Sequence, residues 1–290
     1  MRKFEYFACI DWSGARTERP PGIAVATIGR AGPPALLTPN PRWSRPDVLA
    51  WLAGHATAGT DMLIGFDLSF GLPFADYGRY FPEWRESPAD ARALWEMIDR
   101  ICAPDTHLGA ENFVQHPEAS RHFRHSRDYV GDLFGGGVGR LRLVERHQRE
   151  TRQCNSQSCF NLVGAAQVGK SSLTGMRLLH QLNGQIAIWP FDPVPDSGPV
   201  IIEIYTTIAA RAAGLRAGTS KIRDRDALEV ALRALDTPLP GALARYDDHS
   251  TDALLTAAWM RQAAMREELW NPALLTEDIA QKEGWTFGVI

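Results

Sequence analysis

Five acidic residues lie at positions where their carboxylates could act together on a cation or a ligand. They are Asp11, Asp67, Glu203, Asp248 and Asp252. Hard divalent cations such as Mg²⁺ and Mn²⁺ prefer carboxylate oxygens as ligands, so a cluster of this kind would suit them. A carboxylate that is removed from water is destabilised unless a cation or hydrogen-bond donors compensate its charge. Whether the five residues can meet depends on the elements that carry them.

Two of these residues end predicted strands. Aromatic and aliphatic residues at 4–10 predict a buried first strand, with Asp11 at its carboxyl end and Gly14 in the turn that follows. The near-continuous apolar run 61–67 is typical of a central parallel strand, and it ends at Asp67. Open α/β sheets bind ligands outside the carboxyl ends of their strands, so the two aspartates would meet if their strands are neighbours. Alternatively, each aspartate caps a turn.

The other three acidic residues come late in the chain. Residues 199–205 predict a buried strand that contains Glu203, and a buried glutamate needs a partner. Asp248 and Asp252 are four residues apart near the start of the predicted helix 246–260, where they would share one face. Helix capping and the helix dipole offer an alternative explanation for this pair.

The remaining patterns predict an α/β protein with one large insertion. Two further strands and a helix precede the Asp67 strand, which gives the order βββαβ, at residues 22–28, 35–38 and 44–55. Residues 75–195 are aromatic, proline-punctuated and arginine-rich, with one clear helical stretch at 88–101. We therefore predict a core of residues 1–74 and 196–290 with residues 75–195 inserted as a cap.

The predicted cap contains two features that could contact phosphates. Between residues 113 and 155 there are eight arginines and five acidic residues, which could form a phosphate-facing surface or simply a solvated face. Residues 164–171 match the pattern GxxxxGK[ST] of phosphate-binding loops. Such a loop should follow a buried strand, but residues 159–163 before it are short and lie in irregular sequence. We therefore interpret this segment as a glycine-bounded start of the predicted helix 171–182.

Composition excludes several classes of protein. The 290 residues are 44% hydrophobic, which is enough for a globular core of about one domain, and a net charge of −3 excludes a globally basic nucleic-acid binder. The four cysteines include no CxxC pair, so neither a zinc ribbon nor a thioredoxin-type site is indicated. The charged residues at the start do not suit a signal peptide, and no apolar run is long enough for a membrane span. We expect a cytoplasmic protein without a membrane partner.

Taken together, the order of elements and acidic residues resembles the RNase H-like fold of nucleases and Holliday-junction resolvases. More closely, the chain resembles an uncharacterised bacterial family of predicted RNase H-like nucleases, classified as a domain of unknown function. The likeness covers most of the chain, although Thr206 stands where that family usually has proline. It rests on residues 10–14, 64–73, 164–169, 188–191, 203–205 and 247–253.

The resemblance implies a mixed five-stranded sheet flanked by helices, with the insertion between its fourth and fifth strands. It also implies a metal-dependent nuclease that uses Mg²⁺ or Mn²⁺ and acts on nucleic acid or another phosphodiester. In that reading Asp11 bridges the ions, Asp67 and Asp252 complete their ligands, and Asp248 and Glu203 are further ligands or orienting residues. The arginines of the insertion would hold the phosphates of the substrate.

Two other classes stay open at this point. Sugar kinases and actin-like ATPases resemble the same core and also place an aspartate after the first strand, but they bind ATP between two such domains, and 290 residues are few for that arrangement. A non-catalytic binding protein that retains the fold is the third possibility. A carboxylate cluster that fails to bind metal would favour it.

Overall fold

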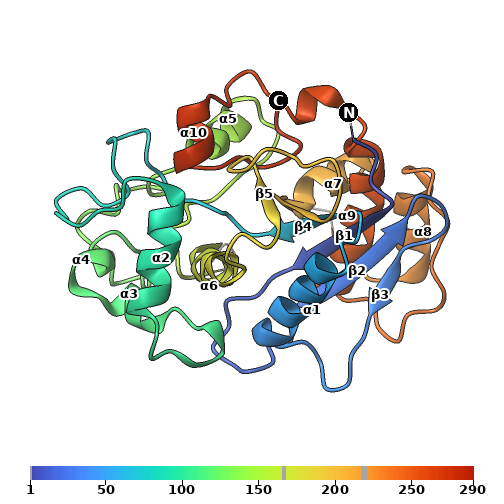
Figure 1. The fold of residues 1–290 in the computed structure, drawn as a ribbon, viewed down its shortest axis with the longest axis horizontal. Helices are drawn as coiled ribbons and strands as arrows, with labels where there is room; N and C mark the ends of the chain where they lie inside the picture. Colours follow the sequence, from blue (N-terminus) through green and yellow to red (C-terminus); the bar gives the residue numbers. More distant parts are fainter. Residues whose placement is uncertain (1, 165–167, 217–220) are drawn as a thin grey trace.

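A mixed sheet forms the centre of the computed structural model, which describes residues 2–164, 168–216 and 221–290. Within these residues the sheet has six strands in the order β3-β2-β1-β4-β6-β5 (Figure 1). The first three form an antiparallel meander, whereas β4, β6 and β5 continue the sheet in parallel with β1. The strands are β1 (Tyr6–Asp11), β2 (Ala24–Gly29), β3 (Ala35–Leu37), β4 (Met62–Asp67), β5 (Ala187–Trp189) and β6 (Val200–Glu203).

The predicted α/β class and mixed sheet flanked by helices are confirmed, but the predicted number of five strands is wrong. The sixth strand, β5, lies inside the predicted cap and pairs with β6 at the edge of the sheet. It has three residues and is followed by Pro190, so its sequence carries too little periodicity to predict a strand. Its extended backbone is specified by pairing with β6 rather than by local preference.

The helices lie on both faces of the sheet and beside it (Figure 1). No helix among the described residues is long and apolar enough to cross a membrane. Ten α-helices and two short 3₁₀ helices are present in this part of the chain: α1 (Arg45–Thr57), α2 (Ala91–Ile101), η1 (Thr106–Leu108), α3 (Glu111–Gln115), α4 (Pro117–Ser120), α5 (Leu143–Glu150), α6 (Val168–Gln181), α7 (Thr206–Ala212), α8 (Arg225–Arg233), α9 (Asp248–Ala263), η2 (Glu267–Leu269) and α10 (Glu277–Lys282).

Alternating side chains of β1 enter two hydrophobic cores, one on each face of the sheet. Ala8 and Ile10 belong to the first core, which also contains buried residues of α1, α2 and α6. Phe7 and Cys9 belong to the second core, which contains buried residues of α7, α8 and α9. This two-residue alternation is the strand periodicity that places successive side chains on opposite faces.

The predicted cap segment shares the first core with the sheet. Phe81, Trp95, Phe113 and Phe160 are buried in the same cluster as Ile10. The described part of 75–195 therefore packs mainly on this face of the sheet and contributes β5 to its edge, while Val144, Cys154 and Trp189 enter the second core. Through this packing, α6 is held close to the end of β1.

The turn after β1 touches the first turn of α6. A Cβ atom at Gly14 would lie 2.4 Å from the Lys170 carbonyl carbon and 2.5 Å from the Ser171 nitrogen. Both are backbone atoms, which cannot swing aside as a flexible side chain can. The absence of a side chain at Gly14 thus allows the Asp11 strand end to pack against α6.

We predict that Gly14→Ala lowers the free energy of unfolding by roughly 1–3 kcal/mol, as is usual when an atom is forced into a closely packed contact. Urea denaturation monitored by circular dichroism measures this change. The matched control is Gly54→Ala in α1, because Gly54 is exposed and a Cβ there would meet no atom within 4 Å. The control should gain about 0.5–1 kcal/mol from its higher helix propensity. Equal stability of Gly14→Ala and the wild type would contradict the close approach.

Candidate active site

The parallel strands of the sheet bring two of the predicted aspartates side by side. β1 pairs with β4 so that Asp11 lies directly opposite Asp67, and each is the last residue of its strand. On the other side of β4, Glu203 ends β6 and pairs with Phe66. The carboxyl ends of three parallel strands therefore carry three acidic residues, as expected for a site in an open α/β sheet.

α9 adds the remaining two carboxylates. Its N-cap is Asp247, whose side chain accepts a hydrogen bond from the Ser250 N–H at 2.9 Å. The side chains of Asp248 and Asp252, one turn apart, are therefore not needed to cap the helix. Asp252 is largely shielded, with 16% of its side chain exposed, and Asp248 is more open at 25%.

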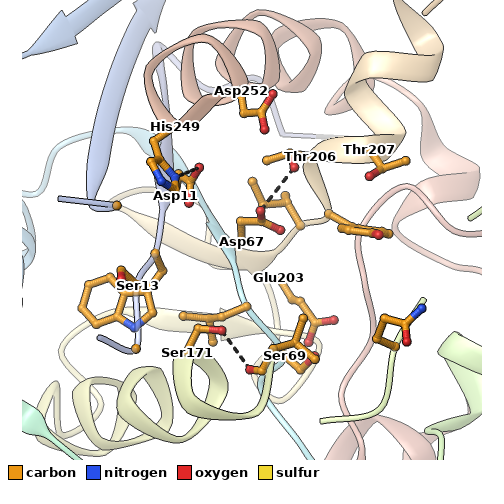
Figure 2. A pocket seen from close by; sticks show the side chains of 18 of the residues that line it. Asp11, Ser13, Asp67, Ser69, Ser171, Glu203, Thr206, Thr207, His249 and Asp252 are labelled. Atoms are coloured by element: carbon orange, nitrogen blue, oxygen red, sulfur yellow. Dashed lines mark hydrogen bonds and ion pairs between the residues drawn. The ribbon is translucent and has the colours of Figure 1, made fainter. Parts of the chain in front are cut away.

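A pocket of about 730 Å³ contains all five predicted site residues. In Figure 2, Asp11 and Asp67 lie near the middle, Asp252 and His249 above them, and Ser69 and Ser171 below. The upper wall comes from α9 and the start of α7, and the lower wall from the turn after β4 and the start of α6. Hydroxyl groups are frequent in the lining, at Ser13, Ser69, Ser171, Thr206 and Thr207.

The hydrogen bonds of Asp11 and Asp67 do not support turn capping. Asp11 Oδ2 lies 3.1 Å from His249 Nδ1, and Thr206 Oγ1 donates to Asp67 Oδ2 at 3.2 Å. Among the described residues, neither carboxylate accepts a hydrogen bond from the turn that follows its strand. The residues that contact them instead belong to α9 and α7, so both carboxylates face the pocket.

The pocket shifts the proton affinities of its acidic groups. Burial, and then the neighbouring charges of Asp11 and Asp252, raise the pKa of Asp67 to about 8. Burial also raises the pKa of Asp252 to about 6, although Lys221 opposes this shift. The pKa of Asp11 is raised by burial, with His249 acting against it. Burial produces most of each shift, and repulsion between the carboxylates adds to it, with only partial compensation from His249, Thr206 and Lys221.

Glu203 is in a different situation, because both of its oxygens are fully engaged. Arg142 forms a two-pronged ion pair with it, at 2.6 Å from Nη2 to Oε1 and 2.8 Å from Nη1 to Oε2. The Phe70 N–H donates to Oε2 and the Thr286 hydroxyl to Oε1. Arg142 also binds Glu145, so a buried network joins β6 to α5 and to the C-terminal segment.

Carboxylate oxygens suit a hard divalent cation, but the side chains of this pocket are not arranged as a complete metal site. Among the described residues, no group of three or more His, Cys, Asp or Glu side chains is placed so as to hold a metal ion. The donors nevertheless fit Mg²⁺ or Mn²⁺, because Asp11, Asp67 and Asp252 supply oxygen ligands only and lack sufficient compensating charge. A divalent ion would supply that charge.

Three residues in contact with the carboxylates were not predicted from the sequence. His249 contacts Asp11, Lys221 contacts Asp248 and Asp252, and Thr206 contacts Asp67. Bonding to Asp11 raises the pKa of His249, which favours its charged form. The position of His249 within the acidic run 247–252 was a usable signal, whereas nothing in the sequence around Lys221 indicated its role.

Most arginines of the insertion do not face this pocket. Of the eight between residues 113 and 155, only Arg142 lines it, and Arg142 is committed to Glu203. Arg140 is buried against Asp76, and Arg121 pairs with Asp132 on the surface. The predicted phosphate-facing surface is therefore not part of the pocket that contains the aspartates.

The segment that resembles a phosphate-binding loop is only partly described, since its residues 165–167 lie outside the described ranges. Residues 159–163 before it form no strand, apart from an isolated bridge between Asn161 and Arg124. Lys170 and Ser171 belong to the first turn of α6, which begins at Val168, three residues before the predicted start at 171, and both line the pocket.

Comparisons with known proteins add no relatives to this description. No family model matches the sequence, and no curated protein or solved structure matches it. The functional argument therefore depends on the residues of this chain.

We predict that, in a chelator, the protein loses stability as the pH rises from 5 to 8. An unfolded aspartate releases its proton near pH 4, whereas folded Asp67 does so at about 8. Between these values the folded state binds more protons than the unfolded state. The stability that comes from protonating folded Asp67 is therefore fully present below pH 4 and is lost as the pH approaches 8. Urea denaturation at several pH values measures the slope.

Asp67→Asn should reduce this pH dependence and stabilise the protein at pH 8. Asp47→Asn is the matched control, because the hydrogen bonds of Asp47 with Ser44 and Arg19 lower its pKa despite some burial, and it is ionised in both states over this range. It should lose a constant amount of stability and keep the wild-type slope. An unchanged slope in Asp67→Asn would contradict the raised pKa.

Proposed function

We propose that this protein is a metal-dependent phosphodiesterase, and specifically a nuclease of RNase H-like fold. The observation that carries the proposal is the convergence of Asp11, Asp67 and Asp252 from three separate segments into one pocket. Groups with strongly perturbed pKa values in a cleft are candidates for function, because active sites commonly use burial and neighbouring charges to shift pKa values. The raised pKa values of Asp67 and Asp252 place them in this class.

The order of elements supports the RNase H-like part of the proposal. β1, β2, β3, α1 and β4 follow one another, and β6 and α9 come after the long insertion. Acidic residues on the first strand, the fourth strand and a late helix match the pattern on which the resemblance rests. Strand β5 and Thr206 are the departures from it, and neither removes an aspartate from the pocket.

In this proposal Asp11, Asp67 and Asp252 hold Mg²⁺ or Mn²⁺, with Asp248 at the margin. Bound divalent ions would activate a water molecule and stabilise the leaving oxygen of a phosphodiester. The chain's own groups orient the carboxylates: His249 fixes one oxygen of Asp11, and the Thr206 hydroxyl fixes one oxygen of Asp67. Residues that orient ligands in this way commonly tune metal affinity.

We assign Glu203 to the framework of the site rather than to its ligands. Its oxygens already accept four hydrogen bonds, and recruiting them to a metal would break the buried two-pronged ion pair with Arg142. The opposite wall offers the hydroxyl groups of Ser13 and Ser69 to a substrate, whereas the Ser171 hydroxyl donates to the Val168 carbonyl, and Lys170 adds a positive charge. A phosphodiester has the complementary oxygens and negative charge.

One observation keeps ATP binding as a second candidate, because Lys170 and Ser171 line the same pocket as Asp11. We nevertheless expect no magnesium-dependent ATP binding, since the described residues 159–163 before this segment form no strand. Isothermal titration calorimetry of the wild type and Lys170→Ala tests this. Micromolar ATP binding that depends on magnesium and disappears in Lys170→Ala would favour the nucleotide-binding class.

The central test of the proposal uses Asp11→Asn. This change keeps the shape of the side chain and removes one negative charge, so manganese-dependent cleavage should be lost. Stability in chelator should be equal or higher, since repulsion with Asp67 is relieved. Cleavage of single-stranded, duplex and branched DNA and RNA, together with melting temperatures in EDTA, measures both effects.

Asp47→Asn again provides the control, because Asp47 closes the capping box of α1 away from the pocket. Removing a negative charge from the first turn of a helix typically costs about 0.3–1 kcal/mol of stability, and activity should survive. If Asp11→Asn melts lower in EDTA and no substrate distinguishes it from the wild type, Asp11 is structural. In that case a non-catalytic binding protein becomes the better description.

A further inference from the structure

Lys221 places a positive charge directly at the acidic end of the pocket. Its Nζ lies 3.3 Å from Asp248 Oδ2 and 3.4 Å from Asp252 Oδ2. The two aspartates stand one turn apart on α9, so a single ammonium group bridges them. Lys221 also lines the pocket that contains Asp11 and Asp67.

The two bridged aspartates depend on Lys221 to different degrees. Asp248 has a second cationic partner, because Arg223 Nη1 lies 2.9 Å from its Oδ1. For Asp252, Lys221 is the only ion-pair partner among the described residues. Asp252 is also the more shielded of the two, and its charge acts on both Asp11 and Asp67. Compensation of the negative charge of Asp11, Asp67 and Asp252 therefore depends on Lys221 more than on Arg223.

The Lys221 side chain is 55% exposed, and the two aspartates favour its charged form. Burial alone would lower the pKa of Lys221, but the charges of Asp252 and Asp248 raise it instead. The ammonium group therefore stays charged at neutral pH. A divalent cation bound by Asp252 would repel it, so the ammonium and the metal ion are competitors for the same carboxylate.

We propose that Lys221 is the internal counter-cation of the metal-free site. Its ammonium group occupies the place beside Asp252 that a divalent cation takes, and it leaves when the ion binds. This inference rests on the metal-binding part of the proposed function. It explains why Asp248 and Asp252 are directed to Lys221 in the metal-free protein.

Lys221 should raise the stability of the metal-free protein and lower its affinity for metal. Without metal, Lys221 stabilises the fold by reducing repulsion among the aspartates. With metal, the same charge weakens binding, because the ion must displace it. Removing the charge should therefore make the metal-free protein less stable and its affinity for metal higher, a combination that a purely structural ion pair would not produce.

The test uses full-length wild type, Lys221→Met, Lys221→Arg and Arg223→Met. Isothermal titration calorimetry with MnCl₂ gives the affinity, and melting temperatures in EDTA and in saturating Mn²⁺ give the stability. We expect Lys221→Met to melt lower in EDTA and to bind Mn²⁺ roughly tenfold more tightly, so that its metal-induced rise in melting temperature exceeds that of the wild type. Lys221→Arg should resemble the wild type.

Arg223→Met is the matched control, because it removes a cation from Asp248 and leaves the Asp252 pair intact. Its manganese affinity should change clearly less than that of Lys221→Met. If Lys221→Met does not fold in EDTA, Lys221→Gln takes its place and should show the same tighter binding.

The outcomes separate this inference from the proposed function. If the wild type binds Mn²⁺ and neutral substitutions of Lys221 bind it equally or more weakly, the counter-cation role is wrong and the metal-dependent function stands. If neither the wild type nor the neutral variants bind Mn²⁺, both are overturned. If only the neutral variants bind Mn²⁺, the counter-cation role is supported. The wild-type site then binds the Lys221 ammonium group in preference to Mn²⁺.

Discussion

The in-register pairing of β1 with β4 is the constraint on which the rest of the site depends. It fixes Asp11 opposite Asp67 at the ends of two buried strands, where neither side chain can move far from the other. Sheet register is held by every core residue of both strands, because a slip by one residue would move the buried side chains to the other face. Repulsion between two carboxylates is too weak to change it. The surroundings must adapt instead, by proton uptake, by contacts with His249 and Lys221, or by binding a metal ion.

Glu203 shows what a fully compensated carboxylate looks like in the same protein. Arg142 meets both of its oxygens, and Glu145 meets the remaining Nε–H of Arg142. Arg142 further donates to the Glu283 carbonyl, and the Glu283 carboxylate accepts from the Phe74 and Leu143 N–H groups. Removing one member of such a network leaves a buried charge unpaired, which typically costs about 3–5 kcal/mol. The network therefore secures the framework around the pocket.

The sequence predicted the elements better than the contacts between them. The strand ends at Asp11 and Asp67 and the start of the helix predicted at 44–55 were recognisable, because apolar runs and helix-start residues are local signals. β5 was missed since its three residues become a strand only through pairing with β6. For Glu203 the need for a partner was clear, but Arg142 is 61 residues away and was indistinguishable from the other arginines of the insertion. Lys221 was missed for the same reason, since its ion pairs connect residues far apart in the sequence.

The difference between the two groups of carboxylates explains why function can reside in one and not in the other. A group whose partners are complete can bind nothing more without first losing a bond, so Glu203 is stable and unavailable. Asp11, Asp67 and Asp252 keep oxygens directed at the pocket, and their charge is only partly met by His249, Thr206 and Lys221. That deficit destabilises the fold, and under the proposed function it is also the free energy available for binding a cation. At these three residues the uncompensated charge lowers the stability of the fold and would favour binding of a cation. The contacts of Glu203, by contrast, only stabilise the fold.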